Sequence, residues 1–236
     1  MTRLLRLAAV AAVLGGIGQI ATTAAEPDLP EDPAAALAKI AGNSFWHADR
    51  VVDLLTFLLV LFALAVFART VTDGGRPWAR AGLTFLAIVG ALGVTAVLTQ
   101  VSLRVVANTW STAPPDARLA HQAVYVVVNE IEGNLFAGAF LAYAAFLALL
   151  GAGIVADGKR RWMGYVLHLI AACLLVGTLG LLATDAAFLL ILAGFGLFDV
   201  LMVVVGFVLW PRRTTSILAV TRGRGAGAKE IEGVEP

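Results

Sequence analysis

The feature that most constrains this chain is the stretch Leu135–Ala156, which contains no charged residue. A helix needs about 20 mostly apolar residues to cross the hydrocarbon core of a bilayer, so this stretch is long enough to span a membrane. Further apolar stretches of similar length alternate with short polar turns along the chain. The sequence therefore predicts six transmembrane helices, at residues 4–25, 51–68, 81–103, 133–156, 162–183 and 186–210.

The composition supports an all-α fold class, a polytopic membrane helix bundle. Hydrophobic residues make up 60% of the chain and charged residues only 14%, whereas soluble domains carry about 25% charged residues. A net charge of +1 does not favour nucleic acid as a partner. We expect the lipid bilayer as the surrounding partner, together with either another membrane protein or a second copy of the chain. The single cysteine, Cys173, lies in an apolar span and is interpreted as a packing residue.

Basic residues are distributed unevenly between the two sides of the predicted bundle. Most of the 17 basic residues fall in the N-terminus, the turns near 69–80 and 159–161, and the tail 211–236. The positive-inside rule then places both termini in the cytoplasm, for a multi-pass protein of the cell membrane. The tail is predicted to be disordered, since it is basic, then glycine-rich and acidic.

The first apolar stretch has two interpretations. Residues 7–25 could be a signal peptide that is cleaved after Thr23-Ala24-Ala25, or a retained first helix. Their length favours retention, because the apolar region of a signal peptide usually has about 7–15 residues.

The fourth span is predicted to belong to a helix about 60 Å long, roughly twice the thickness of the hydrocarbon core. Pro114-Pro115-Asp116 indicates its start, with Asp116 as the capping residue, and Asp157-Gly158 indicates its end. The half before the span carries polar residues at steps of four and three, which share one face. This polar stripe consists of Arg118, Gln122, Tyr125, Asn129 and Glu132.

Valines and an isoleucine form an apolar side on the same segment, and that side must be covered. Either the segment bends at Gly133 and lies in the membrane interface, or the loop 26–50 folds over a straight helix. The loop is favoured because it supplies matching apolar residues, which gives the bundle a small helical extracytoplasmic cap. The stripe would then face water or an outer cleft. The matching residues are Ala36, Leu37, Ile40, Phe45 and Trp46.

Two turns share the pattern V-x-D-G-x-R-x-W, beginning at Val71 and at Val155. Convergence explains the pattern, because a helix end favours glycine, a cytoplasmic turn favours arginine and a re-entering helix favours tryptophan at the headgroups. Duplication of a two-helix hairpin explains it as well. Convergence is favoured, since the flanking spans show little further identity.

Asp199 lies in the middle of the sixth predicted span. A carboxylate at that depth costs at least about 2.5 kcal/mol on insertion scales, so it needs a partner or a function. One interpretation is a proton or cation site, or a contact to a polar ligand. The other is a protonated side chain that is hydrogen-bonded to Thr95 or Thr178.

Several polar residues map to the outer boundary of the predicted bundle, and we single out His121, Asn129, Glu130 and Glu132. Histidines and carboxylates can hold Zn²⁺ and activate water, but these residues form no metal-binding motif. A solvated outer rim is the favoured interpretation. We assign no catalytic residue, no metal ligand and no cofactor.

The second half of the chain, over about residues 81–210, resembles a known protein family in several segments. Glu132-Gly133-Asn134-Leu135-Phe136, the basic turn Arg160–Tyr165 and the closing Val208-Leu209-Trp210 are similar to a broad bacterial family of six-helix integral membrane proteins of unknown function. The resemblance implies six spans and a retained first helix. It implies no activity.

Three function classes remain. The favoured one is a non-enzymatic membrane module that binds a lipid, a small ligand or a membrane partner. The second is a small proton-coupled transporter that uses Asp199, and the third is an outward-facing metal-dependent hydrolase. Whether Asp199 and the outer acidic residues share one cavity would discriminate best among them.

Overall fold

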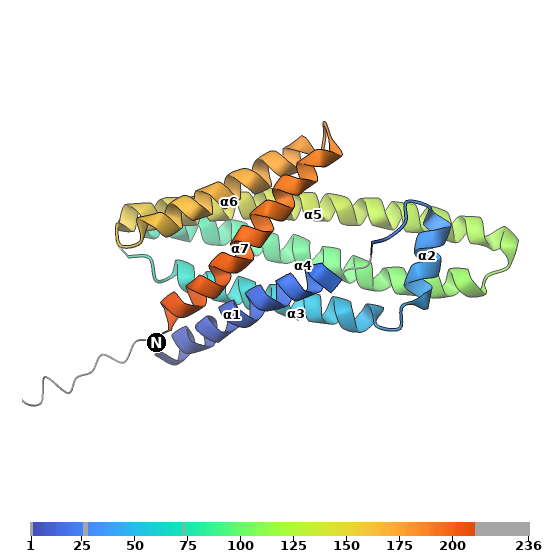
Figure 1. Cartoon of the computed structure of the whole chain (residues 1–236), viewed down its shortest axis with the longest axis horizontal. Helices are drawn as coiled ribbons and strands as arrows, with labels where there is room; N and C mark the ends of the chain where they lie inside the picture. Colours follow the sequence, from blue (N-terminus) through green and yellow to red (C-terminus); the bar gives the residue numbers. More distant parts are fainter. Residues whose placement is uncertain (1, 26–27, 73, 211–236) are drawn as a thin grey trace, which may run out of the picture.

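The helices of the computed structural model follow the predicted spans, with one addition (Figure 1). Residues 2–25, 28–72 and 74–210 are described. Six helices in these ranges are long and apolar enough to cross a membrane, as expected of a multi-pass membrane protein. The elements are α1 (Thr2–Ala25), α2 (Pro33–Gly42), α3 (Trp46–Ala68), α4 (Arg76–Thr112), α5 (Pro115–Asp157), α6 (Arg161–Gly180), the 3₁₀ turn η1 (Asp185–Ala187) and α7 (Phe188–Leu209).

The six long helices form a ring. Each of them packs mainly against the next in the order α1, α3, α4, α5, α6 and α7, and α7 packs against α1 to close the ring. Figure 1 shows the long antiparallel pair α4 and α5 along the whole molecule, with α7 crossing obliquely in front of it. We call the end that holds the α3–α4 and α5–α6 turns the elbow end, and the opposite end the α2 end. The tail 211–236 lies outside the described residues.

α1 is part of this ring and packs against both α3 and α7. Its small residues allow close contact with helices on both sides. A Cβ atom added at Gly15 would lie 2.7 Å from a methyl carbon of Val60 in α3, and one at Gly16 would lie 2.9 Å from the carbonyl oxygen of Asp199 in α7. Such small residues let helix backbones approach closely inside a membrane.

The predicted cap is present as α2, which packs against α4 and α5. Asp32 caps its N-terminus by accepting a hydrogen bond from the backbone N–H of Ala35 at 2.8 Å, and Pro33 follows in the first turn. Leu37 and Ile40 are fully buried in a small cluster with Trp46 of α3. The loop therefore does fold over a straight α5.

Two local predictions about these helices were wrong. Residues 104–112, expected in a loop, continue α4, and only Ala113 and Pro114 separate α4 from α5. Tertiary contacts extend this helix: Ala107 is buried in the cluster around α2, and Arg104 donates hydrogen bonds to the carbonyl oxygens of Ile40 and Asn43 at the end of α2. Asp116 does not cap α5, because Pro114 occupies the N-cap position and Asp116 lies inside the first turn.

The polar stripe of α5 does not face water as a whole, and this prediction also needs correction. Tyr125 and Glu132 are buried, Arg118 and Gln122 are partly buried, and only Asn129 is exposed. α4 and α2 pack against this face, where Gln100 of α4 donates to Glu132 and Trp110 of α4 lies against Arg118. The apolar side expected to be covered is instead largely exposed, at Val124, Val126, Val127 and Ile131.

The elbows meet at the other end of the bundle. α5 ends where predicted, at Gly158, whose φ of 79° is left-handed and suits glycine. The backbone N–H of Thr72 in the first elbow donates to Asp157 Oδ1 at 3.2 Å, and its hydroxyl donates to the same oxygen. The two V-x-D-G-x-R-x-W segments thus lie in contact, although Asp73 is outside the described residues. This contact is compatible with convergence, the favoured explanation of the shared pattern, and with duplication of a hairpin.

Candidate functional site: a polar cavity in the α2 half of the ring

A cavity of about 430 Å³ lies inside the ring, in the half nearer the α2 end. Its lining comes from α1, α3, α4, α5, α7 and the α6–α7 turn. Thr23, Leu181 and Phe188 are exposed lining residues and mark its open side. Four charged side chains also line it: Arg50, Asp53, Glu132 and Asp199.

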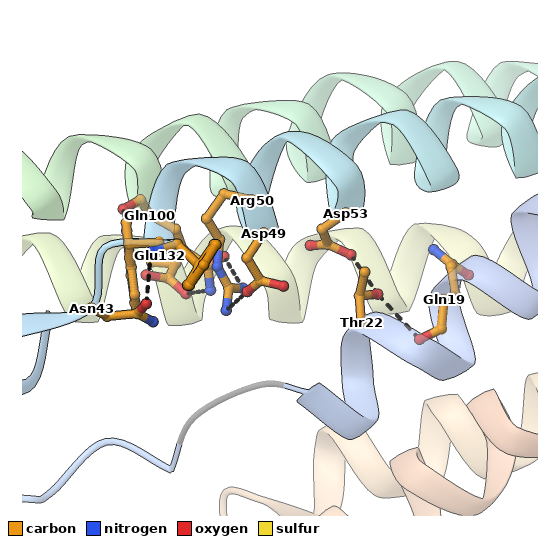
Figure 2. Close-up of polar contacts among 10 residues, drawn as sticks. Gln19, Thr22, Asn43, Asp49, Arg50, Asp53, Gln100 and Glu132 are labelled. Carbon is orange, nitrogen blue, oxygen red and sulfur yellow. Dashed lines mark hydrogen bonds and ion pairs between the residues drawn. The ribbon is translucent and has the colours of Figure 1, made fainter.

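One wall of the cavity is a chain of polar contacts across three helices (Figure 2). Arg50 of α3 forms an ion pair with Asp49 at 3.1 Å, and its Nη1 donates to Gln100 Oε1 of α4 at 2.8 Å. Gln100 Nε2 donates to Glu132 Oε1 of α5 at 2.6 Å. Arg50, Gln100 and Glu132 are all buried, so these charge-assisted bonds are formed in a low-dielectric setting.

Trp46 holds this wall in place from the side of α2. Its indole N–H donates to the backbone carbonyl of Gln100 at 3.0 Å, and its ring lies 5.0 Å from the Arg50 guanidinium carbon. The tryptophan itself is buried against Leu37 and Ile40. Trp46 therefore connects the cap to Arg50.

A second polar pair lies one helical turn further along α3. Thr22 Oγ1 of α1 donates to Asp53 Oδ1 at 3.3 Å, and it also lies 3.2 Å from the Gln19 carbonyl oxygen (Figure 2). Asp53 and Gln19 line both the large cavity and an adjoining pocket of about 110 Å³. Asp53 is three residues from Arg50, so both side chains lie on the same side of α3.

Asp199 is a buried charged residue in the lining of the cavity. It is only 5% exposed, and its Oδ1 has no hydrogen-bond partner among the described residues. Its position in the middle of α7 places it about 16 Å from either end of that helix. A buried polar atom without a partner is uncommon in native proteins and calls for an explanation.

The two predicted partners of Asp199 do not bind it. Thr95 donates to the carbonyl oxygen of Ala91 in its own helix, and Thr178 Oγ1 has no partner among the described residues. Aromatic rings surround the site instead. Phe198 meets Tyr143 edge-on with centroids 5.1 Å apart, and Phe195 meets Phe140 at 5.0 Å.

The structure brings together two of the five predicted residues, Asp199 and Glu132, in one cavity. Asn129 and Glu130 are exposed and His121 is partly buried, and none of these three lines the cavity. Within residues 2–25, 28–72 and 74–210, no group of three histidine, cysteine or acidic residues could hold a metal ion.

Sequence reasoning missed Arg50 and Gln100 as members of the site. Gln100 carried a signal, because an amide near the end of an otherwise apolar span requires a hydrogen-bond partner. Arg50 was counted only as a charge at the end of the loop before α3. Its partner lies 50 positions away in the sequence, which no local pattern connects.

The cavity combines an excess of negative charge with an apolar, aromatic wall. Asp53, Glu132 and Asp199 face it, and Arg50 is the only basic residue among the described residues that line it. Such a site can hold a positively charged group and bury an attached apolar body. Comparisons with protein-family models, with curated proteins and with solved structures find no match to this chain.

Proposed function

We propose that this protein is a non-enzymatic membrane module that binds a small organic cation with an apolar body in the α2-half cavity. The observation that carries the proposal is Asp199: a carboxylate that is 5% exposed, has an oxygen without a hydrogen-bond partner among the described residues, and lines the same cavity as Glu132. A ligand ammonium group would give that oxygen its partner and neutralise the charge.

The charge balance supports a cation over an anion. Arg50 already binds Asp49 and Gln100, so its positive charge is engaged by protein groups. Asp53 and Glu132 leave the lining with net negative charge even when Asp199 is protonated. Like charge in a desolvated site strongly disfavours an anionic ligand.

The apolar wall supports a ligand that is more than a metal ion. Phe136, Phe140, Phe188 and Phe195 line the cavity together with aliphatic side chains. Aromatic faces attract cations and also bury hydrocarbon. A volume of about 430 Å³ lies within the range of about 300–1,000 Å³ that is usual for small-molecule sites.

The distribution of basic residues supports an outward-facing cavity. The elbow end carries Arg69, Lys159, Arg160 and Arg161, and the positive-inside rule assigns such an end to the cytoplasm. On this proposal both termini are cytoplasmic in the cell membrane, and the ligand enters from the exterior. Reporter fusions after Arg161 and after Pro114 should therefore report opposite sides.

The test is binding of benzylammonium, whose N–H groups can donate to Asp199, to the purified full chain in detergent, measured by calorimetry, with ethylbenzene as the neutral isostere. Asp199→Asn keeps the shape but cannot carry a charge, so we expect cation affinity to fall at least about tenfold. Glu130→Gln, an exposed site outside the cavity, should leave binding unchanged. Equal binding of the neutral isostere, or unchanged affinity of Asp199→Asn, would refute the proposal.

A second candidate, a small proton-coupled carrier, is favoured by the depth of Asp199 in the cavity. A titratable residue near the bilayer centre that is reachable from one side is a common element of proton relays. In proteoliposomes that contain a pH-sensitive dye, a carrier would move protons when a benzyltrimethylammonium gradient is imposed, and Asp199→Asn would abolish this flux. A binding module would show no flux with the wild-type protein.

A further inference from the structure

A second large cavity, of about 560 Å³, lies at the elbow end of the bundle, opposite the proposed ligand site. Both elbows contribute to it, together with the ends of α1, α3, α5 and α7. Its lining divides into a basic part and an apolar part. The basic part consists of Arg69, Lys159 and Arg160.

The contact between the elbows brings these cations together. Arg69 follows α3, whereas Lys159 and Arg160 follow α5. The hydrogen bonds from Thr72 to Asp157 join the two turns, and Lys159 Nζ donates to Thr72 Oγ1 at 3.3 Å. The close approach of Gly75 to Gly153 leaves no room for a side chain between the helices. The three cations therefore line one cavity.

The described lining of the cavity carries a net positive charge. Among the described residues, Asp157 is the only acidic one that lines it, and its Oδ1 already accepts from the backbone N–H and the hydroxyl of Thr72. Three basic residues against one acid attract an anion. Phosphate oxygens suit arginine especially well, since a guanidinium can donate two parallel hydrogen bonds to them.

The apolar part of the cavity indicates an anion that carries hydrocarbon. Leu4, Val66, Val208 and Leu209 belong to this part, and Leu4 is 42% exposed on α1. This apolar wall thus continues onto the outer surface of the bundle. Large aromatic side chains are exposed in the elbow-end turns of the helices, as is typical of the headgroup level: Trp78, Trp162 and Tyr165.

We propose that the elbow-end cavity binds the phosphate headgroup of an anionic phospholipid, with Arg69, Lys159 and Arg160 around the phosphate and the acyl chains along the apolar wall. Basic pockets between transmembrane helices on the cytoplasmic side are suited to such headgroups. This lipid site is separate from the proposed cation cavity. Either site can fail its test without affecting the other.

The test measures thermal unfolding of the full chain in detergent after addition of phosphatidylglycerol, or of phosphatidylcholine with the same acyl chains. We expect a larger rise in Tm with phosphatidylglycerol. In Arg69→Gln/Arg160→Gln, two surface cations are lost, and the phosphatidylglycerol affinity should weaken about thirtyfold. Arg69→Lys/Arg160→Lys keeps the charges and should retain most of the binding.

Arg80→Gln is the matched control, because Arg80 is exposed on α4 near the same end but does not line the cavity. It should bind phosphatidylglycerol like the wild type. Three results would overturn the proposal: equal stabilisation by phosphatidylcholine, an equal loss in Arg80→Gln and the double glutamine variant, or full stabilisation by inorganic phosphate alone. The last would identify a site for a free anion and not for a lipid.

Discussion

Gln100 is the side chain on which the polar wall of the cation cavity depends. It accepts from Arg50 at 2.8 Å and donates to Glu132 at 2.6 Å, and so joins α3, α4 and α5. Gln100→Leu preserves most of the volume but removes both bonds. Each bond to an ionised partner contributes about 1.5–3 kcal/mol, so the sum is about 3–6 kcal/mol.

The lower part of that range is expected. Arg50 keeps its ion pair with Asp49 when Gln100 is replaced. We therefore expect Gln100→Leu to lower the free energy of unfolding by about 3 kcal/mol. The assay is reversible unfolding in mixed micelles, followed by circular dichroism as the denaturing detergent is titrated.

Thr99→Val is the control for this variant. Thr99 is the preceding residue of α4, and its hydroxyl donates only to the Thr95 carbonyl on an exposed surface. Its replacement should change stability by no more than about 0.5 kcal/mol. A double-mutant cycle of Gln100→Leu with Glu132→Leu should show a coupling of at least about 1 kcal/mol. Additive effects, or equal stability of Gln100→Leu and Thr99→Val, would show that Gln100 does not join Arg50 to Glu132.

Two further predictions concern packing. Gly75→Ala should destabilise the bundle by about 1–3 kcal/mol, since the new Cβ would lie 1.8 Å from the Gly153 carbonyl oxygen, a backbone atom that cannot rotate away. Gly133→Ala is the control and should be tolerated, because the new Cβ would meet no atom within 4 Å. Equal stability of the two variants would contradict the elbow contact. Paired cysteines at Leu37 and Val128, which share the cluster under α2, should cross-link efficiently, whereas Leu37 with the exposed Val124 should not. The reverse pattern would place α2 on the other side of α5.

Features that depend on a single stretch of chain could be predicted from the sequence. Apolar length determines whether a helix can span the membrane, and all six predicted spans are helices long and apolar enough to do so. The left-handed Gly158 ends α5 where the pattern Asp157-Gly158 indicated. The apolar residues of the loop before α3 correctly predicted a cap, because Leu37 and Ile40 had to be covered.

Which face of α5 points into the bundle could not be predicted from a single stretch of the sequence. Helical spacing correctly grouped Tyr125 and Glu132 on one side, but polarity suggested water as their neighbour. Glu132 is buried because Gln100 of α4 supplies a hydrogen-bond partner, and Tyr125 is buried in a cluster with Leu103 and Ala107 of α4. The valines of the opposite side are exposed as a consequence. A polar face can point inward when another helix satisfies it.

Some features of this protein thus follow from its sequence alone, and others follow from its tertiary structure. The sequence alone determined six membrane-spanning segments, the cap and a carboxylate in the middle of the last span, since hydropathy, helix period and turn chemistry act over a few neighbouring residues. The tertiary structure was needed to establish that the helices close into a ring and that Arg50 contacts Gln100. It also decided that Asp199 shares a cavity with Glu132, and that cations from two elbows line another. These contacts join residues from different helices, and their geometry depends on how the helices pack against each other.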